Sequence, residues 1–360
     1  MPEAPKPGDL IGGRYRLIDV AGRGGMADVW RAEVEGDRGF RKVVAVKQMH
    51  PGLAEQPVYV AMFVEEARLG AALESPNLAE VRDFIADRGN YYMVLEWVEG
   101  VDLGTWTRWH FERGEGPRWE LVAAIGVGVL RGLAAGHERV ADGVAVPGVH
   151  RDVSPHNILC TTRGMVKVID YGLALAGDRT VEATEPGVVK GKMSYLAPEI
   201  VSGGRPIPPS DQFAVGSVMW EALVGRKLFD GANDYETYVR LRECQVQPLK
   251  PLRPDVPAEF AALITRALAA KPDQRYPTAR EFARQIGTVL KKVQLRKDLH
   301  SMLAKTVNDA RASLGMGVRT GDLSALTPIA ELRPEDQPTA FGDRLRGLRH
   351  KLPGLFGRKK

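Results

Sequence analysis

The most informative part of this chain is His150-Arg151-Asp152-Val153-Ser154-Pro155-His156-Asn157, which is followed shortly by Ile169-Asp170-Tyr171-Gly172. Asp152 is a carboxylate that can take a proton from a hydroxyl group. Asn157 supplies an amide and Asp170 a second carboxylate, oxygen ligands of the kind that hold Mg²⁺ against a triphosphate. Because phosphoryl transfer depends mostly on positioning and charge neutralisation, these side chains on two neighbouring loops indicate that chemistry.

The composition is that of an ordinary globular protein. The chain has 360 residues, of which 44% are hydrophobic and 26% charged, enough to fill the core of one large or two small domains. Its net charge of +5 is partly concentrated at the C-terminus, and we expect no nucleic-acid partner. Two cysteines, Cys160 and Cys244, fit no disulfide or zinc pattern. With no signal-peptide pattern and no apolar run of about 20 residues, we expect a cytoplasmic setting.

The first part of the chain has the pattern of an antiparallel sheet. Short runs with β-branched residues predict strands at residues 14–20, 27–34, 42–49, 79–85 and 91–98, and the periodicity of residues 58–73 predicts a helix. Residues 1–13 are expected to form a flexible leader.

Beyond Glu99-Gly100 the periodicity becomes mostly helical. The predicted helices span residues 120–140, 210–224, 234–244, 258–268 and 278–295, and residues 299–314 extend the last of them. A strand-rich part followed by a helix-rich part predicts a ligand site between two lobes.

Two features of the strand-rich part suit a bound phosphate. Gly22-Arg23-Gly24-Gly25-Met26-Ala27 lies between two predicted strands, where glycines let backbone N–H groups approach phosphates, although a plain hairpin turn is the commoner meaning of such a stretch. Val44-Ala45-Val46-Lys47 places a lysine on an apolar strand, either as an edge charge or as a phosphate ligand. Glu66, on the following helix, can neutralise Lys47 and aim it at the α- and β-phosphates.

Together with Ala197-Pro198-Glu199, these motifs occur in the order and rough spacing of the protein-kinase family, and the chain resembles the eukaryotic-like (Hanks-type) Ser/Thr kinases of bacteria. The resemblance implies an α+β, two-lobed protein-kinase fold over residues 14–296. Its N-lobe, residues 14–98, would be an antiparallel sheet with one main helix, and its C-lobe, residues 99–296, would be helical. Residues 297–360 would form a C-terminal helix extension and a basic flexible tail.

The resemblance also implies the site. ATP and Mg²⁺ would be the cofactors, with Mn²⁺ as an alternative metal. Asp152 would orient the acceptor hydroxyl and take its proton, Asn157 and Asp170 would hold the metal, and Lys47 would hold the phosphates with Glu66 as its partner. The residues implied to line the nucleotide are Gly22, Gly24, Val29, Ala45, Lys47, the hinge residues Glu96 and Val98, and Asp102 at the ribose.

Other implied features are structural. Asp211 resembles the buried aspartate that ties down the catalytic loop. Glu199 and Arg275 resemble an ion pair that supports the segment after the activation loop.

Two positions depart from the pattern of the Ser/Thr branch. Ser154 stands where lysine is usual, and Lys192 stands where threonine is usual. One reading is an exchange, in which Lys192 reaches Asp152 and the γ-phosphate while Ser154 supplies the hydroxyl. The other is that Lys192 contacts only an acidic substrate or solvent.

Two further departures concern the second loop and the main helix. Tyr171 replaces the usual Phe, and Gly70, one turn after Glu66, replaces a larger apolar residue. The gap either accommodates a tilted Tyr171 or loosens the helix. His156 stands where some kinases carry an acid that selects basic substrates.

Regulation is suggested by the loop between Asp170 and Glu199. Arg151 resembles the arginine that receives an activation-loop phosphate, and Thr180 or Thr184, with Thr184 favoured, would be autophosphorylated. The alternative is that both are ordinary exposed threonines.

The C-terminal stretch, residues 341–360, interleaves apolar side chains with arginines and lysines. It would dock on an anionic membrane surface, at the inner membrane face, or on an acidic partner. A disordered solubilising tail is the alternative.

The sequence therefore favours a Ser/Thr protein kinase acting on protein substrates. A nucleotide-binding, pseudokinase-like scaffold and a small-molecule kinase on the same fold remain alternatives, and Ser154 weakens the preference for Ser/Thr over Tyr.

Overall fold

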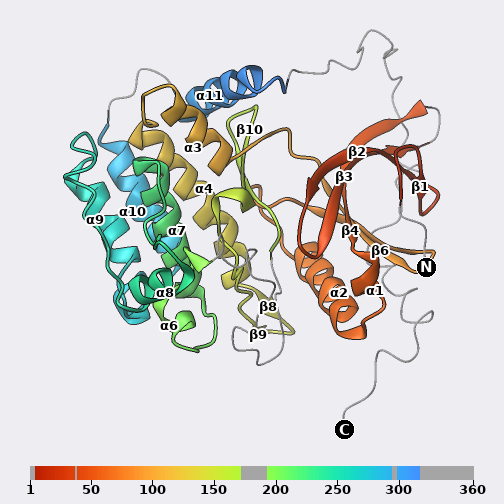
Figure 1. Ribbon diagram of the computed structural model, residues 1–360, viewed down its shortest axis with the longest axis horizontal. Helices are drawn as coiled ribbons and strands as arrows, with labels where there is room; N and C mark the ends of the chain where they lie inside the picture. Colours follow the sequence, from red (N-terminus) through yellow and green to blue (C-terminus); the bar gives the residue numbers. More distant parts are fainter. Residues whose placement is uncertain (1–4, 37–38, 172–192, 294–297, 317–360) are drawn as a thin grey trace. The chain divides into compact units, whose positions relative to one another are not determined.

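A six-stranded antiparallel sheet with one long helix against it forms the N-lobe (Figure 1). The computed structural model describes residues 5–36, 39–171, 193–293 and 298–316, which all belong to one compact unit. The strands, in spatial order β1-β2-β3-β4-β6-β5, are β1 (Leu10–Ile11), β2 (Tyr15–Arg23), β3 (Ala27–Glu35), β4 (Arg41–Met49), β6 (Asn90–Glu96) and β5 (Val81–Asp87). The helices are α1 (Pro51–Ala54) and α2 (Pro57–Ala72).

Alternation along β4 places its lysine under the helix. Val44 and Val46 are buried in a cluster on one face of the sheet. Met49 belongs to a second cluster, with Val60 and Phe63 of α2. Since successive strand residues point to opposite faces, Lys47 shares the face of Met49 and projects toward α2.

The C-lobe is helical and carries a small sheet. Its helices are α3 (Leu103–Glu112), α4 (Trp119–His137), α6 (Pro198–Val201), α7 (Pro208–Val224), α8 (Asp234–Arg242), α9 (Ala258–Ala267), α10 (Ala279–Lys291) and α11 (Leu299–Ser313). Three antiparallel strands, in the order β11-β10-β7, are β11 (Val166–Val168), β10 (Ile158–Thr161) and β7 (Gly100–Asp102), and β8 (Val140–Ala141) pairs with β9 (Val144–Ala145). Short 3-10 turns at Pro155–Asn157 and Pro272–Gln274 complete the lobe.

Helices α4 and α7 form the centre of the C-lobe core. Leu130 and Leu133 of α4 and Phe213 and Trp220 of α7 are fully buried in one cluster. Among the described residues, α4 is the one helix with the length and apolarity of a membrane span, and 78% of that stretch is buried inside the structure. Core packing therefore accounts for its apolar character.

The fold class is confirmed, and three details of the sequence prediction are corrected. Residues 10 and 11 are not part of a flexible leader, because they form β1, which pairs with Tyr15 and Arg16 of β2. The last helix is not extended by residues 299–314, because α10 ends at Lys291 and α11 starts anew with Asp298 as its N-cap. The helix α3 and the strands of the small sheet were missed, because they are short and follow the break at Glu99-Gly100.

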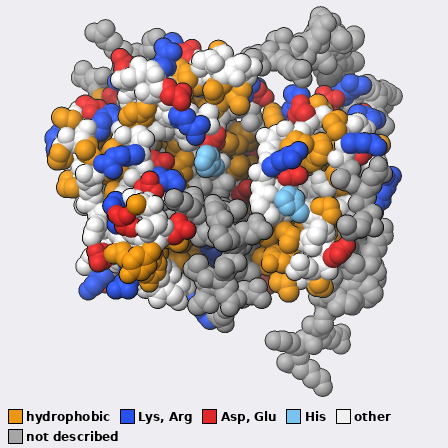
Figure 2. Space-filling model, in the orientation of Figure 1, with side chains coloured by type: hydrophobic (Ala, Val, Ile, Leu, Met, Phe, Trp, Pro, Cys, Tyr) orange, Lys and Arg blue, Asp and Glu red, His pale blue; other side chains and the backbone are white. Residues whose placement is uncertain are grey.

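Charged side chains of both signs are mixed over the visible face of the protein. Figure 2 shows Lys and Arg interspersed with Asp and Glu over the described part of that face. Mixed surface charge of this kind suits solubility rather than an extended single-sign field.

Candidate active site

Lys47 joins three elements of the fold. Its Nζ donates to Glu66 Oε1 of α2 at 2.7 Å and to Asp170 Oδ1, just after β11, at 2.9 Å. The lysine side chain is only 13% exposed. Burial opposes its charge, yet the carboxylates of Asp170 and Glu66 outweigh that effect and raise the pKa of Lys47. A charged ammonium group is thus held between the two lobes.

Backbone strain accompanies the two loops that carry the quoted motifs. Asp170 has φ +52° and Arg151 has φ +70°, a left-handed conformation that non-glycine residues adopt rarely. The Ile169 N–H donates to the Asn157 carbonyl at 3.0 Å, which ties the loops together. Strain that surrounding contacts maintain is characteristic of functional sites.

Asp211 anchors the loop that begins at His150, as the sequence predicted. Its carboxylate accepts from the His150 N–H at 2.8 Å and from the Arg151 N–H at 2.9 Å. It also pairs with His137 Nε2 at 2.7 Å, an unpredicted third contact from the end of α4. The three contacts fix the backbone that precedes Asp152.

Asp152 and Asn157 lie together on that loop. Asn157 Nδ2 donates to the Asp152 carbonyl at 2.8 Å and to Asp152 Oδ2 at 3.0 Å. With the nitrogen engaged in this way, the amide oxygen is the atom of Asn157 suited to a metal. The amide oxygen of Asn157 and the carboxylate of Asp170 are hard donors, and Mg²⁺ is commonly bound by one or two such groups plus substrate phosphates. The residues therefore fit MgATP.

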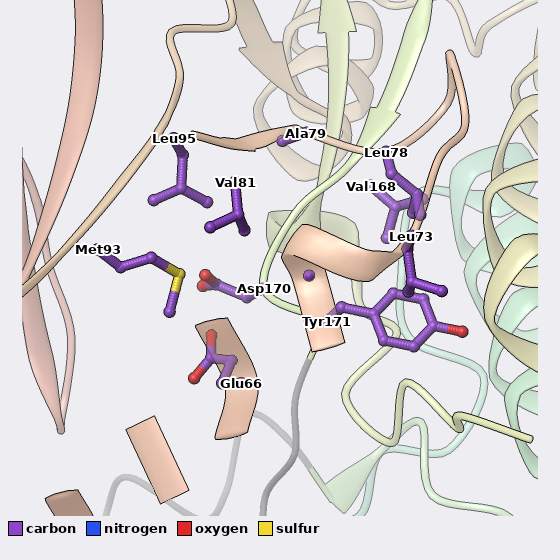
Figure 3. Close-up of a pocket in the computed structure, with 11 residues that line it drawn as sticks. Glu66, Leu73, Leu78, Ala79, Val81, Met93, Leu95, Val168, Asp170 and Tyr171 are labelled. Atoms are coloured by element: carbon purple, nitrogen blue, oxygen red, sulfur yellow. The ribbon is translucent and has the colours of Figure 1, made fainter. Parts of the chain in front are cut away.

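A small cavity of about 20 Å³ lies beside Glu66 and Asp170, with Met93 and Leu95 on its wall (Figure 3). Gly70 also lines it, and a Cβ atom there would lie 2.5 Å from Val81 Cγ2. Helix α2 runs unbroken through this glycine. The missing side chain at Gly70 therefore allows the close approach of Val81, and Tyr171 lines the same cavity.

Tyr171 points away from Asp170, its neighbour in the chain (Figure 3). Its hydroxyl lies 3.3 Å from the Leu133 carbonyl and 3.1 Å from the Gly148 carbonyl. Burial, with a smaller contribution from Asp211, raises the pKa of Tyr171 and keeps the hydroxyl a donor. This polar group thus finds the partners that its burial requires.

The glycine-rich stretch forms the tip of the β2–β3 hairpin. Gly22 lies opposite Val29 in the ladder, and Val29 lies opposite Lys47. The Gly24 N–H donates to the Ala27 carbonyl at 3.0 Å, so a tight turn closes the hairpin. Ala45 lies opposite Leu95 on the adjoining pair of strands. The residues expected around the phosphates and the base thus meet on three adjacent strands.

The hinge and Asp102 lie where the sheet leads into the C-lobe. The Glu96 N–H already donates to the Glu80 carbonyl at 2.8 Å, so its own carbonyl is the group suited to a base edge. The Asp102 carboxylate caps α3 by accepting from the Thr105 N–H at 3.0 Å, and it pairs with His156 Nδ1 at 3.2 Å. Asp102 therefore has a structural role besides any contact with a ribose.

The ion pair between Glu199 and Arg275 is present and bidentate. Both terminal guanidinium nitrogens, Nη1 and Nη2, donate to the carboxylate at 2.7 Å. The Arg275 side chain has no exposed surface, and it also donates to the Ala269 and Pro209 carbonyls. Although burial acts in the opposite direction, Arg275 and Ser210 lower the pKa of Glu199.

For some residues that the sequence predicted to be functional, the contacts described above give no position in the site. Ser154 is buried in the loop between Asp152 and Asn157. Lys192, Thr180 and Thr184 lie outside the described residues, as does the whole of residues 341–360.

Sequence reasoning missed several residues that organise the site. The role of His137 is visible only in its contact with Asp211. A histidine at the end of an apolar helix could have indicated a buried polar contact of this kind. Lys167 of β11 donates to Glu96 at 2.7 Å and escaped notice because its strand was not predicted. Gly136 and Arg311 carry no local sequence signal of a role in the site.

The fold and the Lys47–Glu66–Asp170 arrangement define this chain as a protein kinase. It belongs to the family described as "Protein kinase domain", which matches residues 15–286.

The chain is similar to several bacterial kinases. It is 38% identical over 279 residues to the "Tyrosine-protein kinase MasK" of Myxococcus xanthus, covering 77% of this chain and 43% of that protein. It is 33% identical over 282 residues to the "Serine/threonine-protein kinase PrkC" of Bacillus subtilis, covering 78% of this chain and 41% of that protein. The chain thus spans less than half the length of these curated relatives. Among solved structures, it resembles the kinase domain of Mycobacterium tuberculosis PknI, with 25% identity and a TM-score of 0.58 over 79% of this chain and 99% of that one.

Proposed function

We propose that this chain transfers the γ-phosphoryl group of MgATP to a hydroxyl group of protein substrates. The observation that carries the proposal is the double ion pair of Lys47 with Glu66 and Asp170, at 2.7 and 2.9 Å. A catalytically incompetent scaffold has no need of this arrangement together with Asp152 and Asn157.

The chain's own residues divide the work. Lys47, kept charged by its two partners, holds the α- and β-phosphates. Asp152, fixed by the hydrogen bonds from Asn157, orients the acceptor hydroxyl and accepts its proton. Asp170 and Asn157 would hold the metal, and Mg²⁺ bound there would supply neutralisation of the charge on the phosphoryl oxygens. The hairpin turn that the Gly24–Ala27 hydrogen bond closes offers its remaining backbone N–H groups to the phosphates.

The proposed acceptor is Ser or Thr, which the kinship with PrkC and with the "Serine/threonine-protein kinase PknA" of Mycobacterium tuberculosis, 34% identical over 291 residues, supports. Tyr is the second candidate. It is favoured by the 38% identity to a relative named as a tyrosine-protein kinase and by Ser154, which stands where the Ser/Thr branch usually has lysine.

The first test is autophosphorylation with MgATP, with the phosphorylated residue types and positions read by mass spectrometry. We expect phosphate on Ser or Thr in the unmodified chain and none in Asp152→Asn or Lys47→Met. Lys305→Met, an exposed lysine of α11, is the matched control and should keep full activity. Phosphate on Tyr alone would move the assignment to the second candidate.

Two other outcomes would overturn the proposal. MgATP binding without turnover, under every activating condition, would support the scaffold. Turnover with metabolites but not with proteins would support a small-molecule kinase.

Regulation and location belong to the same proposal. The mapping shows whether Thr180 or Thr184 receives phosphate, and Lys192→Ala should lower kcat far more than nucleotide affinity if the exchange with Ser154 operates. The protein would act in the cytoplasm, peripheral at the inner membrane face through residues 341–360. Co-sedimentation with anionic vesicles, with and without those residues, tests that part.

A further inference from the structure

Helix α11 lies beyond the residues that match the family, and it is fastened to the C-lobe next to the hinge (Figure 1). Its apolar face is buried through Leu303, Val307 and Ala310. The Trp106 Nε1–H of α3 donates to Thr306 Oγ1 at 3.0 Å, and Asn308 Nδ2 donates to the Thr162 carbonyl at 3.0 Å. The helix is therefore an ordered part of the lobe, and most of these docking contacts lie before its last turn.

The last turn of α11 holds the chain segment that leaves the hinge. Arg311 Nη1 donates to the Gly100 carbonyl at 3.0 Å, and Nη2 pairs with the Glu99 carboxylate. The Arg311 side chain is only 11% exposed, although Glu99 is 50% exposed. A buried guanidinium with a backbone and a carboxylate partner is far more restrained than an ordinary surface ion pair.

Glu99 passes this restraint to the hinge itself. Its second carboxylate oxygen accepts from the Trp97 indole N–H at 2.9 Å, and its carbonyl accepts from the Thr162 N–H at 2.9 Å. Trp97 lies between Glu96 and Val98, whose backbone groups are proposed to meet the adenine edge. A continuous chain of bonds thus runs from Arg311 to the hinge.

Gly100 makes the arrangement tight. A Cβ atom at this position would lie 2.1 Å from the Cys160 carbonyl oxygen, so the backbone packs directly against β10. Asp102 follows two residues later, at the end of β7. Arg311 therefore acts on the short segment that connects the proposed adenine and ribose contacts.

We propose that Arg311 is a positioning residue for the nucleotide, and that α11 is a functional part of the nucleotide site rather than an appendage. The proposal rests on the proposed function, because it assigns Arg311 to the binding of MgATP. Arg311 touches no substrate; it fixes Glu99, and through Glu99 it fixes Trp97 and the hinge backbone.

The test compares Arg311→Met with Lys305→Met, which removes the same charge from an exposed position of the same helix. Calorimetry with MgADP should show about tenfold weaker binding for Arg311→Met and unchanged binding for Lys305→Met. In Arg311→Met, KM for ATP should rise together with the dissociation constant of MgADP. KM for the protein acceptor and kcat at saturating ATP should stay close to those of the unmodified chain. Arg311→Lys keeps the positive charge but loses the planar set of guanidinium donors. Its MgADP affinity should lie between those of Arg311→Met and Lys305→Met.

A double-mutant cycle that combines Arg311→Met with Glu99→Gln tests whether Arg311 acts on the hinge through Glu99. The effects of Arg311→Met and Glu99→Gln on MgADP affinity should be clearly non-additive, because both break one chain of bonds. Equal MgADP affinities in Arg311→Met and Lys305→Met, in a chain that binds nucleotide and turns over, would overturn this inference alone. Failure of the unmodified chain to bind MgADP would overturn the proposed function as well.

Discussion

The hydroxyl oxygen of Tyr171 lies 1.8 Å from the point that a Cβ atom on Gly136 would occupy. The tyrosine that follows Asp170 thus reaches into helix α4 at a position where only glycine leaves room. Its hydrogen-bonding distance to the Leu133 carbonyl, one turn earlier in the same helix, shows that the approach is used. The pair secures one end of the loop that carries Asp170.

Gly136→Ala should therefore destabilise the protein by roughly 3 kcal/mol, because the added methyl overlaps both the Tyr171 hydroxyl and its ring. Chemical denaturation with urea measures the effect. The control is Gly287→Ala in α10, where a Cβ atom would meet nothing within 4 Å. That change should stabilise by about 0.5–1 kcal/mol, through helix propensity alone. Stabilisation of the protein by both changes would show that Tyr171 moves aside at little cost.

Glu66→Gln should lower kcat by about 100-fold, because Lys47 loses one of its two charged partners and is drawn toward Asp170 alone. Steady-state kinetics with saturating MgATP measure the change. Glu65→Gln is the matched control, since Glu65 is the neighbouring residue on the same helix and its side chain is 58% exposed. Equal kcat values for the two variants would show that Glu66 has no part in catalysis.

Arg275→Met should cost roughly 3–5 kcal/mol of stability, because it leaves the Glu199 carboxylate without its bidentate partner. Arg284→Met, which breaks an exposed pair with Glu281 on α10, should cost less than about 1 kcal/mol. Thermal or urea unfolding of the two variants gives the comparison. Similar losses would mean that the buried pair is replaceable by apolar packing.

The same pair predicts an acid dependence. Glu199 has a lowered pKa in the folded state, so its contribution to stability is present above its ordinary value of 4.5. That contribution is lost as the pH falls through the lower, folded-state value. Unfolding measured from neutral pH into this acid range should therefore show a decline that Arg275→Met lacks. A parallel decline in both proteins would assign the acid sensitivity to other groups.

His110 predicts a second pH dependence in a different window. It lies between the rings of Trp106 and Trp109, at 4.5 and 4.8 Å between centroids, and among the described residues its Nε2 has no hydrogen-bond partner. Burial lowers its pKa from 6.5 to about 4. Because the unfolded chain binds the proton first, stability should fall as the pH drops from 6.5 toward 4.

The size of that loss should be on the order of 1–2 kcal/mol once partial exposure is allowed for. His110→Phe should flatten the curve of unfolding free energy against pH in this window. His156→Gln, a change at a side chain that is 72% exposed, is the control and should leave the slope intact. An unchanged slope in His110→Phe would show that the buried imidazole does not drive it.

The amino-acid sequence by itself predicted the fold class and the family, which are confirmed, and it proposed the residues of the candidate site. Lys47 and Glu66 lie on a strand and a helix that follow one another, so periodicity and spacing were enough to suggest their meeting. Asp170 is far from them in the chain. The set of motifs placed it in the same site, but its ion pair with Lys47 was not predicted.

Tertiary structure alone decided the contacts between residues that share no local pattern. Arg311 and Glu99 are 212 positions apart, and nothing in the composition of α11 says which surface its last turn meets. Gly136 reads as an ordinary glycine in an apolar helix until the Tyr171 ring is placed against it. Periodicity reports which face of an element is buried, whereas the partner on that face depends on how the whole chain packs.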